Sequence, residues 1–303
     1  MNSGFNVEKI GFAQRQRLTY IESVAYWEGR IDRPRVCGAF NVSENHVTKD
    51  FRLYKDAFPG NIRYDERERA YLALPRFKPR IGKGSPEEYL ALLRSQAEFG
   101  DGTVLSPGAS GILVDVVPAL KSRLAPAILN AVTRAISART GLTISYQSRN
   151  RSNPAQRCVW PHALAFSGTR WHARAWDDER QTFIDLVLQR ILSAAPLRKP
   201  APCGPESDAE WTNLVDLDVI PSKQLSPGQA AVVAQEFGMS PAGRGWVWKV
   251  RLRQCLAGYF IYLHRLDLEK DPQRLIELRD FSLAARYIAP REKDATRAST
   301  ESG

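Results

Sequence analysis

The spacing of apolar residues changes abruptly near residue 60, and this change limits what the first part of the chain can fold into. Apolar residues recur every three or four positions over Phe12–Trp27, which predicts a helix that Gly29 ends. Beyond residue 60 the period becomes two. It predicts two short strands, Asn61–Tyr64 and Arg69–Leu74, joined by a turn at Asp65–Glu68.

Two further helices are predicted between these segments, Pro34–Phe40 and one that begins after Ser43, a residue suited to a helix N-cap. The later helix carries one apolar stripe, and the residues outside it are polar or cationic. The stripe consists of Val47, Phe51, Tyr54 and Phe58, and the polar residues are Asn45, Thr48, Lys49, Arg52 and Lys55. A helix that packs by one face and offers such groups on the other suits the major groove of DNA.

Three helices followed by a hairpin predict a winged helix-turn-helix, a DNA-binding fold, over residues 1–80. The candidate DNA-contacting residues lie on the third helix and on the hairpin, or wing: Ser43, Asn45, His46, Thr48, Lys49, Arg52, Lys55, Arg63, Arg67 and Arg69. This region holds 15 Lys and Arg residues against 10 Asp and Glu residues. The competing interpretation is a small helical domain whose charged side chains are only solvated, and Glu66 and Glu68 in the turn favour it.

The composition is that of a folded protein with a polyanionic partner. The net charge is +10 and the pI is about 9.6. A length of 303 residues predicts two or three domains. No run reaches the ~18 apolar residues of a membrane span, so we expect a cytoplasmic protein without a membrane partner. The four cysteines and four histidines are scattered, and we expect no metal, no disulfide and no cofactor.

The residues after the first module predict helices that bridge two modules, and we assign residues 81–132 to them. The basic segment Phe77–Gly84 is broken by proline and glycine and predicts a linker. Ser85–Glu88 predicts a helix start with a capping box, in a helix that glycines at 100 and 102 stop. Another helix is predicted over Pro126–Thr140, ending at Gly141.

The period becomes two again from Leu142. Four strands are predicted: Leu142–Tyr146, Val159–Phe166 with an interruption at Pro161, Trp171–Trp176 and Thr182–Leu188. Several short strands with tight turns predict a small β-barrel. Trp171 and Trp176 are expected to belong to the core of this barrel rather than to stack on bases.

These strands resemble the WYL domain, a family named for a Trp-Tyr-Leu strand. The resemblance covers residues 133–195 and is carried by Ile144–Ser148, Arg157–Leu164, Gly168–Trp176 and Phe183–Ile191. The triplet itself reads Trp171-His172-Ala173, a Trp-His variant similar to the BrxR- and CapW-like repressors of phage-defence islands associated with BREX and CBASS systems. The resemblance implies an α+β multidomain protein with a winged helix, an Sm-like WYL barrel and a C-terminal extension that helps to dimerise.

The resemblance also implies that the barrel senses a nucleotide or a short single-stranded nucleic acid. The pocket residues of the family fall on Tyr146, Ser148, Arg157, His162 and Arg190. Hydroxyl, guanidinium and ring groups suit a site for phosphate and base. On spacing alone, the alternative is that the tyrosine and the histidine satisfy buried hydrogen bonds and that the two arginines are surface residues.

The remainder predicts a small α+β domain over residues 205–290 and a disordered polar tail over residues 291–303. The segment Ala194–Ser207 is rich in proline, alanine and glycine and predicts a linker. The predicted elements are strands over Trp211–Ile220 and Gly245–Leu252, a helix opened by Ser226, and Cys255–Leu263, which fits either a strand or a helix.

The motifs favour a regulator over an enzyme. The sequence holds no phosphate-loop, dinucleotide, zincin or nucleophile-elbow pattern, so catalysis is not expected. The preferred hypothesis is a homodimeric repressor of a phage-defence operon that binds an inverted repeat in double-stranded DNA. A nucleotide or short nucleic acid in the WYL domain would release it. The alternative is an accessory protein that binds single-stranded DNA or RNA mainly through the barrel.

Overall fold

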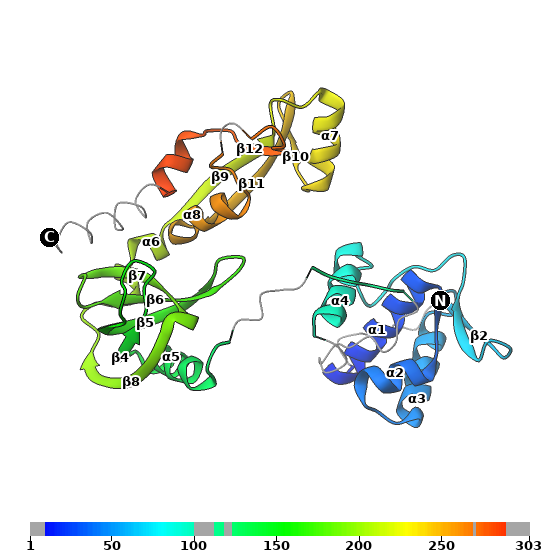
Figure 1. The fold of residues 1–303 in the computed structure, drawn as a ribbon. Coiled ribbons are helices and arrows are strands. Elements are labelled where there is room, and N and C mark those ends of the chain that lie inside the picture. The colour runs from blue at the N-terminus through cyan, green and yellow to red at the C-terminus, as the bar shows by residue number, and fades with distance from the viewer. Residues whose placement is uncertain (1–9, 100–111, 118–122, 269–270, 289–303) are drawn as a thin grey trace. The chain divides into compact units, whose positions relative to one another are not determined.

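The computed structural model describes residues 10–99, 112–117, 123–268 and 271–288, and the chain divides into two units, residues 1–120 and 121–303 (Figure 1). The predicted glycine stop at 100–102 and the predicted tail at 291–303 lie outside the described residues. Each unit has hydrophobic cores of its own, so each is considered separately.

The first unit is a winged helix-turn-helix, as predicted. Its elements are α1 (Phe12–Glu28), β1 (Arg30–Ile31), α2 (Arg33–Phe40), α3 (Glu44–Ala57), β2 (Ile62–Asp65), β3 (Ala70–Ala73) and α4 (Pro86–Phe99). The wing is a three-stranded antiparallel sheet in the order β1-β3-β2 rather than the two-stranded hairpin expected. Two residues are too few to show a period of two, which is why the pattern missed β1.

The helix ends of this unit differ in detail from the prediction. Gly29 ends α1 in the left-handed region, at φ 77°. The first turn of α2 is capped by Asp32, whose carboxylate accepts from the N–H of Arg35 at 2.9 Å. Ser43 occupies the N-cap of α3, but its hydroxyl makes no capping bond and instead lies 3.0 Å from Nδ1 of His46.

The segment predicted as a linker, 77–84, is held against α1 by a buried carboxylate. Glu22 is 1% exposed and accepts four hydrogen bonds of 2.8 Å, from the hydroxyl of Tyr54 and from the N–H groups of Arg80, Ile81 and Gly82. Asn61 exchanges two further bonds with the backbone of Lys78, at 2.9 and 3.1 Å. A buried charge is tolerated only with a full set of partners, so these bonds define one path for the segment.

The second unit begins with α5 (Pro126–Ala138) and an antiparallel sheet in the order β7-β6-β5-β4-β8. The strands are β4 (Thr140–Tyr146), β5 (Ala155–Phe166), β6 (Trp171–Asp177), β7 (Thr182–Val187) and β8 (Ile191–Pro200). Helix α5 packs on one face. The sheet is not the closed barrel that we expected, because its edge strands β7 and β8 do not pair in the described structure. The 3₁₀ turn Leu188–Arg190 connects these two edge strands.

Three further expectations for this sheet were wrong in detail. The first half of the predicted linker Ala194–Ser207 belongs to strand β8, which among the described strands pairs only with β4. An edge strand tolerates prolines that a central strand excludes, so a segment rich in proline can still form a strand. Strand β5 is continuous, and Pro161 marks a register shift rather than a break. Helix α5 ends at Arg139 in the left-handed region, while Gly141 lies in β4, where a Cβ atom would lie 2.7 Å from Nε1 of Trp160.

The C-terminal part forms a second sheet in the order β10-β11-β9-β12, with helices packed on it. Its elements are η4 (Pro205–Ser207), α6 (Ala209–Thr212), β9 (Leu214–Pro221), α7 (Pro227–Glu236), β10 (Ser240–Ala242), β11 (Gly245–Arg253), α8 (Gln254–Leu263) and β12 (Ile276–Leu278). Ser226 caps α7 in a capping box, as predicted. The undecided segment 255–263 is helical, with Cys255, Gly258 and Ile261 buried at helical spacing.

Candidate functional site

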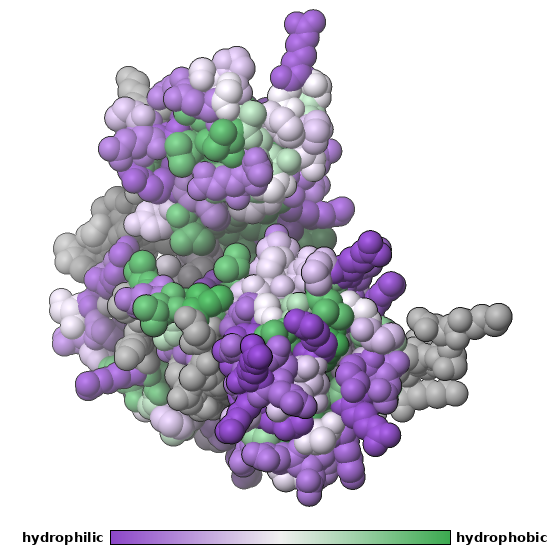
Figure 2. All heavy atoms as spheres, turned by 90° about the vertical axis from the view of Figure 1, so that its right-hand side faces the viewer, coloured by the Kyte–Doolittle hydropathy of each residue, from purple (hydrophilic) through white to green (hydrophobic). Residues whose placement is uncertain are grey.

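Helix α3 has two opposite faces. Val47, Asp50, Phe51 and Tyr54 are buried, and all ten residues predicted to contact DNA, on α3 and on the wing, are exposed. On α3, Asn45, Lys49 and Arg52 follow each other at four- and three-residue spacing and therefore lie on one face. Figure 2 looks from the β2 side of Figure 1 and shows mainly hydrophilic residues on the surface that it presents.

The buried face of α3 is oriented by polar contacts that the sequence analysis missed. The carboxylate of Asp50, 1% exposed, accepts from Nε of Arg17 at 2.6 Å and from Nε2 of Gln14 at 2.8 Å, both on α1. Tyr54 adds its bond to Glu22. A signal for these contacts was present, since Asp50 and Glu22 each fall at helical spacing within an apolar face.

The wing rests on the same helix. The rings of Phe51 on α3 and Tyr71 on β3 stack with centroids 4.0 Å apart. The tip turns because Asp65 accepts from the N–H groups of Arg67 and Glu68, at 3.0 and 3.1 Å, an Asx-type turn. The wing arginines therefore project from a tip whose position relative to α3 is set by packing.

The five residues that the WYL resemblance places in one pocket do not all meet. Tyr146 and Arg190 line a cavity of about 550 Å³. The hydroxyl of Ser148 instead accepts from the N–H of Asn150 at 3.2 Å. Arg157 and His162 belong to two buried ion-pair groups outside that cavity's lining.

Arg157 is 4% exposed and is paired with Asp177, with Glu179 at 3.8 Å. Its guanidinium lies 6.0 Å from the ring centre of Tyr146. Its buried Nε has no hydrogen-bond partner among the described residues. Tyr146 is also buried, and its hydroxyl accepts from the N–H of Val187 at 3.2 Å. These contacts are those of a structural arginine within the sheet.

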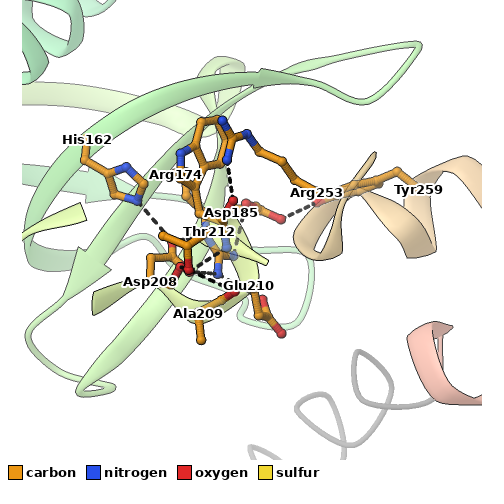
Figure 3. A network of polar contacts seen from close by, with 10 residues as sticks. His162, Arg174, Asp185, Asp208, Ala209, Glu210, Thr212, Arg253 and Tyr259 are labelled. Atoms are coloured by element: carbon orange, nitrogen blue, oxygen red, sulfur yellow. Dashed lines mark hydrogen bonds and ion pairs between the residues drawn. The ribbon is translucent and has the colours of Figure 1, made fainter. Parts of the chain in front are cut away.

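His162 belongs to a network that joins the sheet to α6 (Figure 3). Its Nε2 lies 3.0 Å from Asp208, which also accepts from Arg174 at 2.7 and 2.9 Å. Arg174 reaches Asp185 at 3.3 Å and Glu210 at 2.9 Å as well. Burial raises the pKa of Asp208, but the hydrogen bonds from Arg174 and His162 outweigh it and hold that pKa well below its usual range.

The cavity itself is basic. Arg149, Arg170 and Arg190 line it, and their guanidinium groups have no carboxylate partner among the described residues, while Asp185 is its single carboxylate. Ser167, Thr169 and His172 add polar groups. The sequence analysis missed Arg149 and Arg170 because both lie in loops, where no spacing rule connects them with Arg190. The volume is within the roughly 300–1,000 Å³ of small-molecule sites.

Two exposed aromatic rings also bear on binding. Trp171, expected in the core, is 47% exposed, and it contacts Phe166, 49% exposed, with ring centres 5.0 Å apart.

In the described part of the chain, no three His, Cys, Asp or Glu side chains gather as metal ligands would. No described helix is long and apolar enough to cross a bilayer.

Comparison with known proteins assigns the chain to a family. The model of the BrxR transcriptional regulator winged helix-turn-helix domain matches residues 13–95, the WYL model matches residues 127–196, and the model of the BrxR C-terminal dimerization domain matches residues 214–283. The DNA-binding transcriptional repressor CapW of Stenotrophomonas maltophilia is 33% identical over 265 residues, which are 86% of this chain and 85% of that protein. The chain belongs to the CapW/BrxR family.

A CapW repressor of Pseudomonas aeruginosa is 30% identical over 269 residues, 87% of this chain and 86% of that protein. Among solved structures, the proteasome accessory factor PafBC of Arthrobacter aurescens matches 93% of this chain and 49% of its own chain. The identity is 17% and the TM-score is 0.26, so nothing about this chain follows from the match. Within the CapW/BrxR family, the cavity residue Arg190 falls inside the WYL match, whereas α8 falls inside the dimerization-domain match.

Proposed function

We propose that this CapW/BrxR protein is a homodimeric DNA-binding repressor of a phage-defence operon. The observation that carries the proposal is α3, which exposes amide, hydroxyl and cationic side chains on one face, while an ion pair of Asp50 and a hydrogen bond of Tyr54 hold the other face against α1. Such a helix reads base edges and phosphates in the major groove, and the wing arginines reach the neighbouring backbone. The relatives named CapW are DNA-binding transcriptional repressors, which supports this proposal.

The match to a dimerization domain supports a two-fold symmetric dimer. Two recognition helices related by such an axis fit two half-sites of an inverted repeat. The basic cavity supports release by an anionic effector, a nucleotide or a short nucleic acid. For release, the effector must bind the DNA-free pose of the dimer more tightly than the DNA-bound pose.

A gel shift with the DNA upstream of the protein's own operon tests this proposal. Lys49→Glu together with Arg52→Glu reverses two charges on the exposed face of α3 and is expected to abolish the shift. Arg244→Glu changes one exposed cation on the C-terminal sheet and is the control, expected to leave the shift intact. Equal binding by all of these proteins, or no preference for an inverted repeat, would contradict the proposal.

The dependence on salt gives a second measure. Each neutralised phosphate contributes about −0.9 to the slope of log K against log salt concentration. Arg52→Ala is therefore expected to make the slope shallower by about one unit if that guanidinium lies on a phosphate. Equal slopes for Arg52→Ala and the unmodified protein would show that Arg52 does not contact a phosphate.

Exposure of Trp171 and Phe166 favours a second candidate, binding of single-stranded DNA or RNA by the WYL sheet. Exposed aromatic rings next to a cation, here Arg170, stack on unpaired bases of any sequence. Under this function Trp171→Ala weakens single-strand binding, and charge reversal at Lys49 and Arg52 leaves it intact. Loss of duplex binding alone after that charge reversal favours the repressor.

A further inference from the structure

One wall of the basic cavity comes from the C-terminal domain. The WYL match ends at residue 196 and the dimerization-domain match begins at residue 214. Even so, Gly258, Tyr259, Tyr262 and Leu263 of α8 line the cavity together with the arginines of the WYL sheet. Residues of two family domains thus enclose one space.

Tyr259 connects this wall to the sheet. Its hydroxyl donates to Oδ2 of Asp185 at 3.2 Å (Figure 3). Its ring stacks on that of His172 with centroids 4.9 Å apart. Asp185 also accepts from Arg174 at 3.3 Å, so its carboxylate keeps a partner when the phenol turns away. Both Tyr259 and Asp185 also line a second cavity of about 880 Å³, so they form the partition between the two spaces.

Helix α8 also packs directly against the turn between β5 and β6. Gly168, in the turn between β5 and β6, has a φ of 89°, and a Cβ atom there would lie 2.5 Å from Cδ2 of Leu263. The left-handed φ favours glycine at this position, and the turn lies against the side chain of Leu263 on α8. A small displacement of α8 changes both this packing and the bond from Tyr259 to Asp185.

The charges define the ligand that fits this cavity. Three guanidinium groups without carboxylate partners among the described residues suit a phosphate, and the rings of Tyr259 and Tyr262 suit a planar group. An anion bound to the arginines lies in the same cavity as Asp185, whose negative charge it repels. The one neutral donor that α8 offers beside that carboxylate is the phenol of Tyr259.

We propose that α8 completes the ligand site of the WYL domain and that Tyr259 is a ligand-binding residue. A phosphorylated ligand with a planar ring takes its phosphate to the three arginines, and the hydroxyl of Tyr259 passes from Asp185 to the ligand. Occupancy then loosens the contact between the sheet and α8 and alters how the C-terminal domain is held. The inference rests on the proposed function only for the existence of an anionic effector.

The test measures calorimetric binding of 5′-AMP to the full-length protein and its variants. Tyr259→Phe removes the hydroxyl and keeps the ring. It is expected to weaken AMP binding by about three- to tenfold, because it loses the bond to the charged ligand but no longer has to give up the 3.2 Å bond to Asp185. Tyr64→Phe is the matched control and is expected to bind AMP as the unmodified protein does, because Tyr64 lies on β2, outside the lining of the cavity. Arg170→Ala is expected to weaken AMP binding because it removes one of the three guanidinium groups that the WYL domain supplies to the cavity.

Hydrogen exchange provides a readout that a purely structural role would not change. AMP is expected to alter the exchange of α8 amides in the unmodified protein and in Tyr64→Phe, but less in Tyr259→Phe. Equal AMP affinity of Tyr259→Phe and the unmodified protein would overturn the inference, as would the absence of AMP binding to the unmodified protein. The gel shift without AMP is a separate measurement. If it shows no DNA binding, the proposed repressor function fails, but the AMP affinities of the two tyrosine variants still test this inference.

Discussion

Replacing Glu22 by glutamine is expected to destabilise the N-terminal unit far more than its small change in shape suggests. In the structure, Oε1 accepts from Tyr54 and from the N–H of Arg80, and Oε2 accepts from the N–H groups of Ile81 and Gly82. Glutamine keeps one oxygen and replaces the other by an amide NH₂ group, which donates. Two of the four donors therefore lose their acceptor in a site that is 1% exposed.

The magnitude follows from those two donors. A buried donor left without a partner costs about 1–3 kcal/mol, so the variant is expected to lose about 2–6 kcal/mol. That loss is concentrated in the segment that the carboxylate holds, residues 80–82. The segment is then expected to open before the unit unfolds, since local opening needs only those bonds to break.

Hydrogen exchange of the full-length protein measures this opening directly. In the unmodified protein the amides of residues 80–82 are expected to exchange slowly, and in Glu22→Gln about 30-fold faster or more, which corresponds to ~2 kcal/mol. Glu88→Gln is the matched control, because that side chain is exposed at the start of α4. Unchanged protection in Glu22→Gln would refute the reasoning that this carboxylate holds the segment in place.

Two more predictions concern the second unit. The pKa of Asp208 is raised by burial but lowered further by hydrogen bonds, chiefly from Arg174. Since the folded pKa lies below the unfolded value of about 3.9, the stability that Asp208 provides is present above that value and is lost as the pH falls through the folded pKa. Urea unfolding at pH 7 and pH 3 is expected to show a difference between the unmodified protein and Asp208→Asn that shrinks at the lower pH. Gly141→Ala is expected to cost about 1–3 kcal/mol because its Cβ meets Trp160, whereas Gly228→Ala, with nothing within 4 Å, is expected to leave the melting temperature unchanged or slightly raised.

The elements predicted most reliably from the sequence are those in which a single spacing of apolar residues, helical or alternating, continues along the whole element. The stripe of α3 and the alternation of β6 are of this kind: α3 begins directly after Ser43, as predicted, and β6 is one residue longer than predicted. Strand β8 failed for the opposite reason. Its prolines and alanines are those of a linker, and only its position at a sheet edge makes them acceptable.

The candidate sites were predictable to different degrees. Exposure of the residues of α3 follows from the helical stripe, so the six candidate DNA contacts within that helix could be chosen from spacing. The cavity could not, because Arg149, Arg170 and Tyr259 come from two loops and a helix of another domain. No local pattern links residues that meet only through the packing of α8 on the sheet.

The buried charges lie where elements meet, and this placement bears on function. Asp50 joins α1 to α3, and Arg174 with Asp208 joins the sheet to α6. Desolvating such pairs costs about as much free energy as their attraction returns, so they add little net stability, but breaking one by losing a partner is costly. Each pair therefore favours a single geometry over its alternatives. The contact between Tyr259 and Asp185 differs, because a neutral phenol leaves a carboxylate that Arg174 still holds. Of these three junctions, this is the one that a ligand can open without leaving a buried charge unpaired.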